Sequence, residues 1–164
     1  MLTGLPPVVD AATRVLVLGS MPGALSLRVE QYYAHPRNAF WRIMSEVVHL
    51  DSDAAYSVRL GQLQRAGIGL WDVLRLCDRP GSLDSAIVRE SMEVNDFGRM
   101  FDAHPGIVRV CFNGAKAAQV FARLVAPALE SAVQFHKLPS TSPANAAIPY
   151  DAKLQAWRAA MDVG

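Results

Sequence analysis

An unbroken apolar run at residues 15–18, Val-Leu-Val-Leu, constrains the fold more than any other stretch of the chain. A run without alternating polar residues is typical of a strand that is buried on both faces of a sheet. The run stops at Gly19, and Pro22 and Gly23 disfavour regular structure directly after it. The sequence therefore predicts a strand over 13–18 in a covered sheet, followed by a long loop.

Helical periodicity begins after this loop. A helix is predicted over 37–49, because apolar residues there recur at the spacing of one helix face; they are Phe40, Ile43, Met44 and Val47. Similar patterns predict further elements along the chain. Helices are expected at 54–66, around Val94, Phe97 and Phe101, at 117–125, and from Asp151, as an N-cap, onward. Strands are expected at 70–74, 107–112 and 133–138. Long loops are expected at 76–92 and 139–149.

This alternation of strands and helices determines the expected fold class. It predicts an α/β protein with three α/β/α layers around a central four-stranded, mainly parallel sheet. The 164 residues suffice for one domain with a sizeable core, so a single domain over 1–164 is expected. Ligands of such sheets bind outside the carboxyl ends of the strands. Four loops leave from those ends, after Leu18, Leu74, Phe112 and Leu138.

Composition narrows the class and the compartment. The chain is 51% hydrophobic and 19% charged with a net charge of +1, which fits a globular protein. No apolar run approaches the roughly 18 residues of a membrane span, and no signal peptide is recognisable. Cys77 and Cys111 lie far apart and indicate a reducing, cytoplasmic environment. Two cysteines cannot bind an iron–sulfur cluster, and the four histidines lack metal-ligand spacing, so no metal and no cofactor are expected.

Two stretches close to the first strand carry a family resemblance. GSMPG at 19–23 and YAHPRNAFW at 33–41 resemble motif one of the uracil-DNA glycosylase superfamily, and most of all its hypoxanthine-DNA (deoxyinosine) glycosylase family. Further matches occur at 70–74, 112–114 and 138–145. The resemblance implies a monofunctional, monomeric DNA glycosylase. It would flip a deaminated base, with deoxyinosine the expected one, out of double-stranded DNA and hydrolyse its N-glycosidic bond.

Three other functions remain compatible with the sequence. One is a G:U/T mismatch-specific glycosylase, from the next most similar family. Another is a catalytically weak module that binds damaged DNA. The third is a hydrolase of small nucleotides on a doubly wound sheet. The substrate that releases its base separates these functions from one another.

The resemblance implies that Ser20 and Asn38 are catalytic. Most of the superfamily has an Asp or Asn at the position of Ser20, where it orients the attacking water, and a serine cannot act as a carboxylate base. In the hypoxanthine family the proposed replacement corresponds to Asn38. An amide cannot take up a proton, so it would position the water through its carbonyl oxygen. Asn38 precedes a predicted helix, so an N-cap is the alternative role, and the two roles are compatible.

Tyr33 matches an aromatic residue that stacks on the flipped base in the mismatch-specific relatives. An ordinary core aromatic is the alternative. Successive side chains of an extended chain alternate in direction, so Tyr32 and Tyr33 are not expected to face one core together. One of them is then expected to face the binding pocket, where an extruded base needs an aromatic surface.

Asp72 interrupts an apolar strand, where a lone carboxylate is costly unless it is paired or used. The structural alternative is a salt bridge to Arg75 or to a loop arginine. By resemblance, Asp72 occupies the position from which relatives read the base edge with an Asn. An ionised carboxylate only accepts hydrogen bonds, and hypoxanthine offers its N1–H as a donor.

The remaining candidate residues belong to loops at the same edge of the sheet. Glycines there allow close backbone approach to a ligand, although a tight turn explains them equally well. By resemblance the loop at 138–145 enters the minor groove, and Leu138 replaces the His of the uracil-specific branch. The further substrate-binding candidates are Gly19, Met21, Pro22, Gly23 and Asn113; the DNA-binding candidates are Arg37, Ser140, Thr141, Ser142, Pro143, Ala144 and Asn145.

Overall fold

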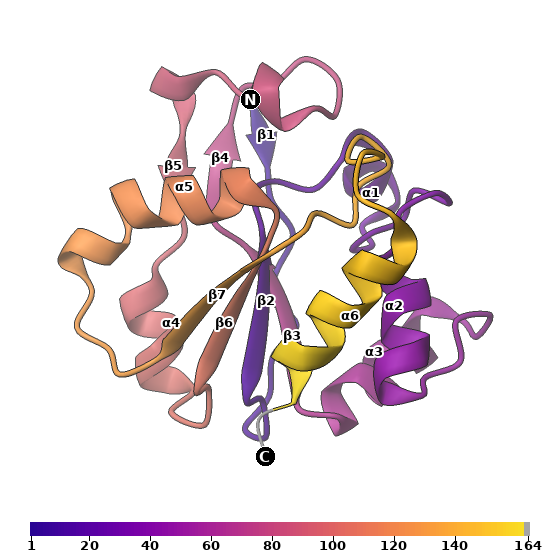
Figure 1. Ribbon diagram of the computed structural model, residues 1–164. Coiled ribbons are helices and arrows are strands. Elements are labelled where there is room, and N and C mark those ends of the chain that lie inside the picture. The colour runs from indigo at the N-terminus through magenta and orange to yellow at the C-terminus, as the bar shows by residue number, and fades with distance from the viewer. Residues whose placement is uncertain (163–164) are drawn as a thin grey trace.

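The structure is a computed structural model that describes residues 1–162, and its central feature is a parallel sheet. The apolar run forms the buried strand β2, which lies between two other strands (Figure 1). The order is β3-β2-β6-β7, and all three neighbouring pairs are parallel. The strands are β2 (Val15–Gly19), β3 (Ile68–Asp72), β6 (Arg109–Asn113) and β7 (Gln134–Leu138).

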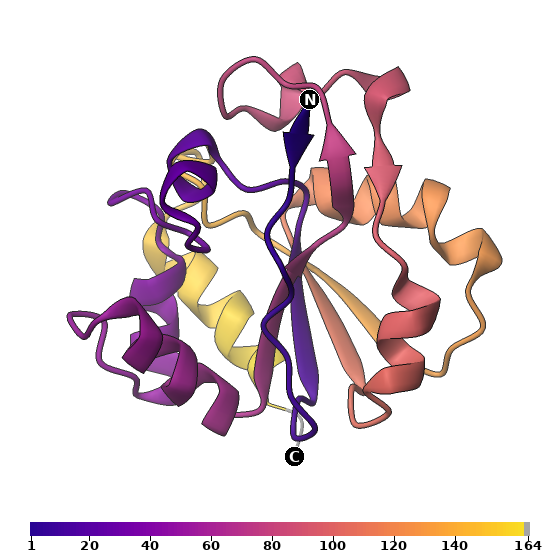
Figure 2. The same ribbon diagram turned by 180° about the vertical axis from the view of Figure 1, so that it is seen from behind.

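Helices cover both faces of this sheet, so the expected three-layer fold is confirmed (Figures 1 and 2). Side chains of β2 alternate between two cores, with Val15 and Val17 in one and Leu16 and Leu18 in the other. One core is covered by α2 (Phe40–Val48), α3 (Tyr56–Arg65) and α6 (Tyr150–Met161), and the opposite core by α4 (Phe97–Ala103) and α5 (Ala115–Leu124).

A second, antiparallel sheet lies beyond the carboxyl ends of the main strands, and the sequence did not predict it. It has the order β1-β4-β5, with β1 (Leu2–Thr3), β4 (Leu74–Cys77) and β5 (Glu93–Val94). The strand expected over 70–74 is therefore wrong in its end, since β3 stops at Asp72 and the chain enters β4 after Val73. Val94, expected in a helix, lies in β5, and α4 begins only after Asp96, whose side chain accepts a hydrogen bond from the Arg99 N–H.

The long loops contain short helical segments. The loop after β2 includes α1 (Ala24–Val29). The helix predicted from residue 37 is α2, which begins later, at Phe40. The loop expected over 76–92 includes two 3-10 turns, η1 (Asp84–Ala86) and η2 (Arg89–Ser91), and a third, η3 (Ala126–Ala128), follows α5. The N-cap of α6 is Pro149, and Asp151 lies in the first turn instead.

The crossover directions determine where a ligand can enter. The chain leaves β2 through α2 and α3 on one face, whereas it reaches β6 and β7 through α4 and α5 on the other face (Figure 1). The carboxyl ends of β2 and β6 therefore form the switch point of the sheet, where doubly wound folds bind ligands. Within residues 1–162, no helix has the length and apolar character needed to span a bilayer.

Candidate active site

A cleft of about 850 Å³ opens at this switch point. The last residue of every strand of the main sheet lines it, namely Gly19, Asp72, Asn113 and Leu138. The cleft brings together nearly all the residues that the sequence suggested. They are Gly19, Ser20, Met21, Pro22, Gly23, Tyr33, Asn38, Asp72, Asn113 and the six residues 140–145. Arg37 lies outside the lining and is exposed.

Gly19 and Asp72 are paired across β2 and β3 at the floor of the cleft. A Cβ atom on Gly19 would lie only 2.5 Å from Asp72 Oδ1. No side chain fits this space, so glycine is required for the carboxyl group of Asp72 to point where it does. The glycine is thus explained by the close approach of an acidic side chain.

Asp72 is a buried acid without an ion-pair partner. Its side chain is 4% exposed, and Oδ2 has no hydrogen-bond partner among the described residues. Neither expected salt bridge forms, because Arg75 pairs with Glu93 and the guanidinium of Arg79 bonds to backbone oxygens. Burial and then the charge of Asp84 raise the pKa of Asp72 to about 7, against the opposing charge of Arg79. At neutral pH the carboxyl group is therefore partly protonated, and it can donate as well as accept.

The two adjacent tyrosines pack against the same core, contrary to expectation. Tyr33 has a φ of 56°, so the chain is not extended there and the expected alternation does not apply. Its ring stacks on Phe40 with centroids 4.1 Å apart, and it still lines the cleft. The Tyr33 hydroxyl has no partner within residues 1–162. Tyr32 is 3% exposed and donates to the Pro6 carbonyl at 2.8 Å, so Tyr33 is the more accessible ring of the pair.

Asn38 stands both at the start of α2 and in the cleft. Its Oδ1 accepts a hydrogen bond from the Phe40 N–H at 2.9 Å, while Ala39 is the N-cap of the helix. This bond fixes the orientation of the amide. The preceding turn is braced by His35, whose Nδ1 accepts from the Arg37 N–H at 3.1 Å.

Ser20 is buried and is hydrogen-bonded to a second acid. Its Oγ donates to Asp84 Oδ1 at 2.5 Å. Asp84 begins η1 and lines the cleft, and no local sequence pattern indicated it, because its surrounding loop has no periodicity. Arg79 from the same loop is also buried, at 6% exposure, and donates to the carbonyls of Met21 and Pro22. The Met21 side chain belongs to the core, so only its backbone can approach a ligand.

Asn113 and Thr141 fasten the loop at 139–149 to the end of β6. Asn113 Nδ2 donates to Thr141 Oγ1 and Asn113 Oδ1 accepts from the Thr141 N–H, both at 2.9 Å. The Thr141 side chain is 1% exposed, so it cannot contact DNA directly as the sequence suggested; it anchors the loop instead. The neighbouring Ser140, Ser142 and Asn145 bond within the loop and remain partly exposed in the cleft.

Charge in and around the cleft is local. Two basic residues, Lys116 of α5 and Lys137 of β7, also line the cleft. The described part of the chain contains no group of three or more His, Cys, Asp or Glu residues that could hold a metal ion. The site thus consists of a buried protonatable acid, a serine-bound carboxylate, an oriented amide and an aromatic ring.

A doubly wound sheet with a cleft at its switch point defines a class of ligand-binding α/β proteins, and comparison with known proteins identifies the family. The family description "Uracil DNA glycosylase superfamily" matches residues 6–160. The chain belongs to the uracil DNA glycosylase superfamily. The resemblance seen in the sequence is therefore confirmed.

Two relatives are named hypoxanthine DNA glycosylase. The chain is 43% identical to the one from Methanosarcina barkeri over 117 residues, which cover 71% of this chain and 73% of the relative. It is 41% identical to the one from Methanosarcina acetivorans over 143 residues, which cover 87% of each protein. A solution NMR structure from Methanosarcina acetivorans, described as a candidate uracil DNA glycosylase, matches with a TM-score of 0.82 and 36% identity. It covers 97% of this chain and 95% of that one.

Proposed function

We propose that the protein is a monofunctional DNA glycosylase that releases deaminated bases from double-stranded DNA, with hypoxanthine in deoxyinosine as its main substrate. The observation that carries the proposal is the buried, unpaired carboxyl group of Asp72 on the floor of the cleft. The two relatives named hypoxanthine DNA glycosylase support the same substrate.

The protonated form of Asp72 is complementary to the edge of the base. A carboxylic acid offers a carbonyl acceptor and a hydroxyl donor side by side. Hypoxanthine offers N1–H and O6 in the matching order, so one acid can form two hydrogen bonds to it. Tyr33 supplies the stacking surface that an extruded base needs, with its other neighbour Phe40 supporting the ring.

Other parts of the cleft receive the sugar and the DNA. Asn38, with its amide already oriented, positions the attacking water, and the backbone of 19–23 approaches the nucleotide. Arg37 and the exposed parts of the loop at 140–145 contact the DNA backbone. We expect a monomer acting as a single domain over 1–164 in the cytoplasm, where the free, buried Cys77 and Cys111 stay reduced.

Uracil is the second candidate substrate, because its N3–H and O4 present the same donor and acceptor pair to Asp72. A G:U/T mismatch-specific glycosylase is therefore the alternative activity. Leu138, which is 7% exposed and packs in the core, provides no polar group for a uracil-type leaving group. This observation favours hypoxanthine.

Single-turnover base release distinguishes these functions. Matched duplexes carry inosine, uracil, xanthine or a G:T mismatch, and inosine is expected to react fastest. Asn38→Ala should lose most of this activity. The melting temperature of Asn38→Ala separates fold from chemistry, because loss of the bond from the Phe40 N–H costs about 1 kcal/mol and should lower the melting temperature only slightly.

Each alternative has a distinct outcome in this experiment. Fastest release from G:U or G:T duplexes would assign the mismatch-specific activity. Tight binding without any base release would indicate a damaged-DNA binding module. Reaction of free nucleosides but not of duplexes would indicate a small-nucleotide hydrolase.

A further inference from the structure

The loop between β4 and β5 is fastened to the loop after β2. Arg79 donates to the carbonyls of Pro22 and Gly81 at 2.8 Å and of Met21 at 3.3 Å. Ser82 Oγ accepts from the Ala24 N–H at 2.9 Å. These bonds join two segments that are far apart in sequence. They hold the loop beside residues 21–24, and Ser82, Leu83 and Asp84 line the cleft.

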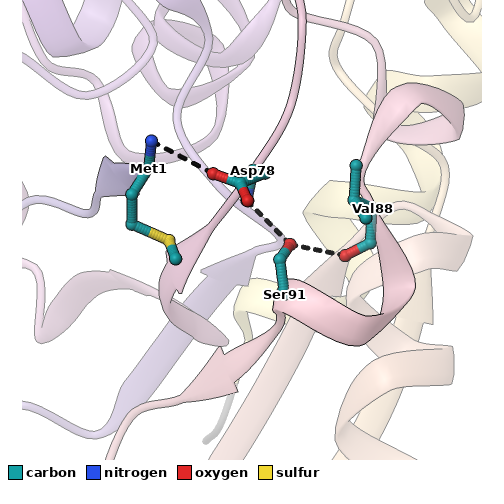
Figure 3. A network of polar contacts seen from close by, with 4 residues as sticks. All are labelled: Met1, Asp78, Val88 and Ser91. Atoms are coloured by element: carbon teal, nitrogen blue, oxygen red, sulfur yellow. Dashed lines mark hydrogen bonds and ion pairs between the residues drawn. The ribbon is translucent and has the colours of Figure 1, made fainter.

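A small polar network closes the base of the same loop (Figure 3). The Ser91 hydroxyl accepts from the Asp78 N–H at 2.8 Å and donates to the Val88 carbonyl. The Val88 N–H in turn donates to the Asp78 carbonyl at 2.8 Å, and the Asp78 side chain pairs with the amino group of Met1. The loop is therefore fixed at its base and near its tip, so the segment between these points, residues 83–87, has a defined position.

Asp84 lies in this segment, and only one of its two carboxylate oxygens is hydrogen-bonded to the described residues. Ser20 bonds Oδ1, and no second donor bonds this side chain among residues 1–162. Asp84 is half-buried and lines the cleft together with Asp72, Tyr33 and Asn38. A carboxylate with one oxygen held and one unsatisfied, at the edge of a substrate-sized cleft, is suited to bind and deprotonate a water molecule.

We propose that Asp84 is a catalytic residue that takes the proton from the water attacking C1′ of the flipped nucleotide, and that Ser20 is the positioning residue that aims it. The inference rests on the proposed glycosylase function. The C1′–N bond breaks and its electron pair leaves with the base, while the water oxygen bonds to C1′. One water proton passes to Asp84, and the released base takes up a proton from solvent, so the products are the free base and an abasic sugar.

Several charged groups face Asp84 and contribute to its behaviour. Asp72 on β3 and Arg79 in its own loop lie on the floor side, and Lys116 of α5 and Lys137 of β7 line the wall beside it. The two acids have different roles. Asp84 is anchored by a hydroxyl and receives a proton, whereas Asp72 is buried against Gly19 and holds the base. Their mutual repulsion is consistent with the raised pKa of Asp72.

The test compares Asp84→Asn, Ser20→Ala, Ser20→Thr and Glu90→Gln by single-turnover release of hypoxanthine. Asp84→Asn keeps the acceptor for Ser20 but removes the base, so the rate should fall by roughly 10²–10⁴-fold with DNA binding and melting temperature unchanged. Ser20→Ala should reduce the rate less, and Ser20→Thr, which keeps the hydroxyl, should restore most of it. Glu90→Gln is the matched control: it neutralises an exposed acid of the same loop that lies outside the cleft and outside the network of Figure 3, and its rate should equal that of the wild type.

Three results would overturn the inference. The first is an Asp84→Asn rate within twofold of the wild type. The second is an equal loss in Glu90→Gln, which would indicate a general effect of loop charge. The third is a Ser20→Thr variant that loses as much activity as Ser20→Ala. Wild-type protein that releases no base from any duplex would instead refute the proposed function, and the two failures are thereby distinguished.

Discussion

Asp72 has a measurable influence on stability, because it is an acid that folding makes harder to ionise. Burial raises its pKa from 3.8 to about 7. Between these two values the folded state binds more protons than the unfolded chain, so the free energy of unfolding falls as pH rises through this interval. The fall is at most about 1.4 kcal/mol per pH unit for one such group.

Asp72→Asn should abolish this loss, because an amide has the shape of the protonated acid and does not titrate. The melting temperature of the variant relative to the wild type should be nearly unchanged at pH 4 and clearly higher at pH 8. Thermal unfolding across this pH range provides the measurement. Glu90→Gln, which removes one exposed acid elsewhere in the chain, is the control. A difference that stays constant with pH would mean that Asp72 is ionised in the folded protein.

The ring of Tyr33 lines the cleft, whereas its hydroxyl forms no hydrogen bond among the described residues. The hydroxyl is buried and has no hydrogen-bond partner among the described residues, and an unsatisfied group of this kind costs about 1–3 kcal/mol. Tyr33→Phe should therefore melt at the same temperature as the wild type or higher, with base release nearly unchanged. Tyr33→Ala should lose both the Phe40 contact and about 1–3 kcal/mol of stacking on the flipped base. Equal damage from both substitutions would show that the hydroxyl, and not the ring, contacts the substrate.

At the scale of elements, the Asn113–Thr141 pair is one of the contacts that position the loop at 139–149, together with the bonds from Trp157 Nε1 to the Pro139 carbonyl and from the Ala39 N–H to the Thr141 carbonyl. Thr141→Val keeps the shape of the side chain but leaves Asn113 Nδ2 without its acceptor, at a cost of about 1–3 kcal/mol. The variant should melt earlier and bind duplex DNA more weakly. Thr141→Ser retains the hydroxyl and is the matched control. Equal melting temperatures for the two variants would mean that the Thr141 hydroxyl adds no stability beyond the bond from the Thr141 N–H to Asn113 Oδ1.

Most of the main sheet could be predicted from the sequence because β2, β3 and β6 contain short apolar runs bounded by turn residues. The small sheet could not, because β1 and β5 are only two residues long and carry no periodic pattern. The end of β3 was misplaced for a related reason. Apolar residues resume directly after Asp72 with Val73 and Leu74, although the chain changes sheets there.

The candidate site was predictable only where residues follow strands or match a motif. Asp72 and Tyr33 were found in this way, but the extended geometry assumed for Tyr33 was wrong, since a φ of 56° is set by the folded loop. Asp84 and Arg79 were missed. Their positions depend on contacts with residues about 60 positions away, and no local pattern encodes such contacts.

At the scale of the whole molecule, the two sheets have separate tasks. The parallel sheet fixes the floor of the cleft through the ends of its four strands. The antiparallel sheet lies beyond those ends (Figure 2), and the loop that contains Asp84 connects its strands β4 and β5. The acid on the floor and the acid on the wall are thus held by different layers of the molecule, which the chain connects directly through Val73.

Val73 is the single residue that separates β3 from β4, and both its N–H and its carbonyl are hydrogen-bonded. Its N–H donates to the Gly19 carbonyl at 2.8 Å, and its carbonyl accepts from the Asn95 N–H at 2.9 Å. Because side chains alternate along a strand, one residue inserted or deleted at this joint would turn β3 or β4 over. The tips of neighbouring loops can change in length during evolution, but this crossing cannot. We therefore expect descendants of this chain to vary freely in loop size while the spacing from Asp72 to Leu74 stays constant.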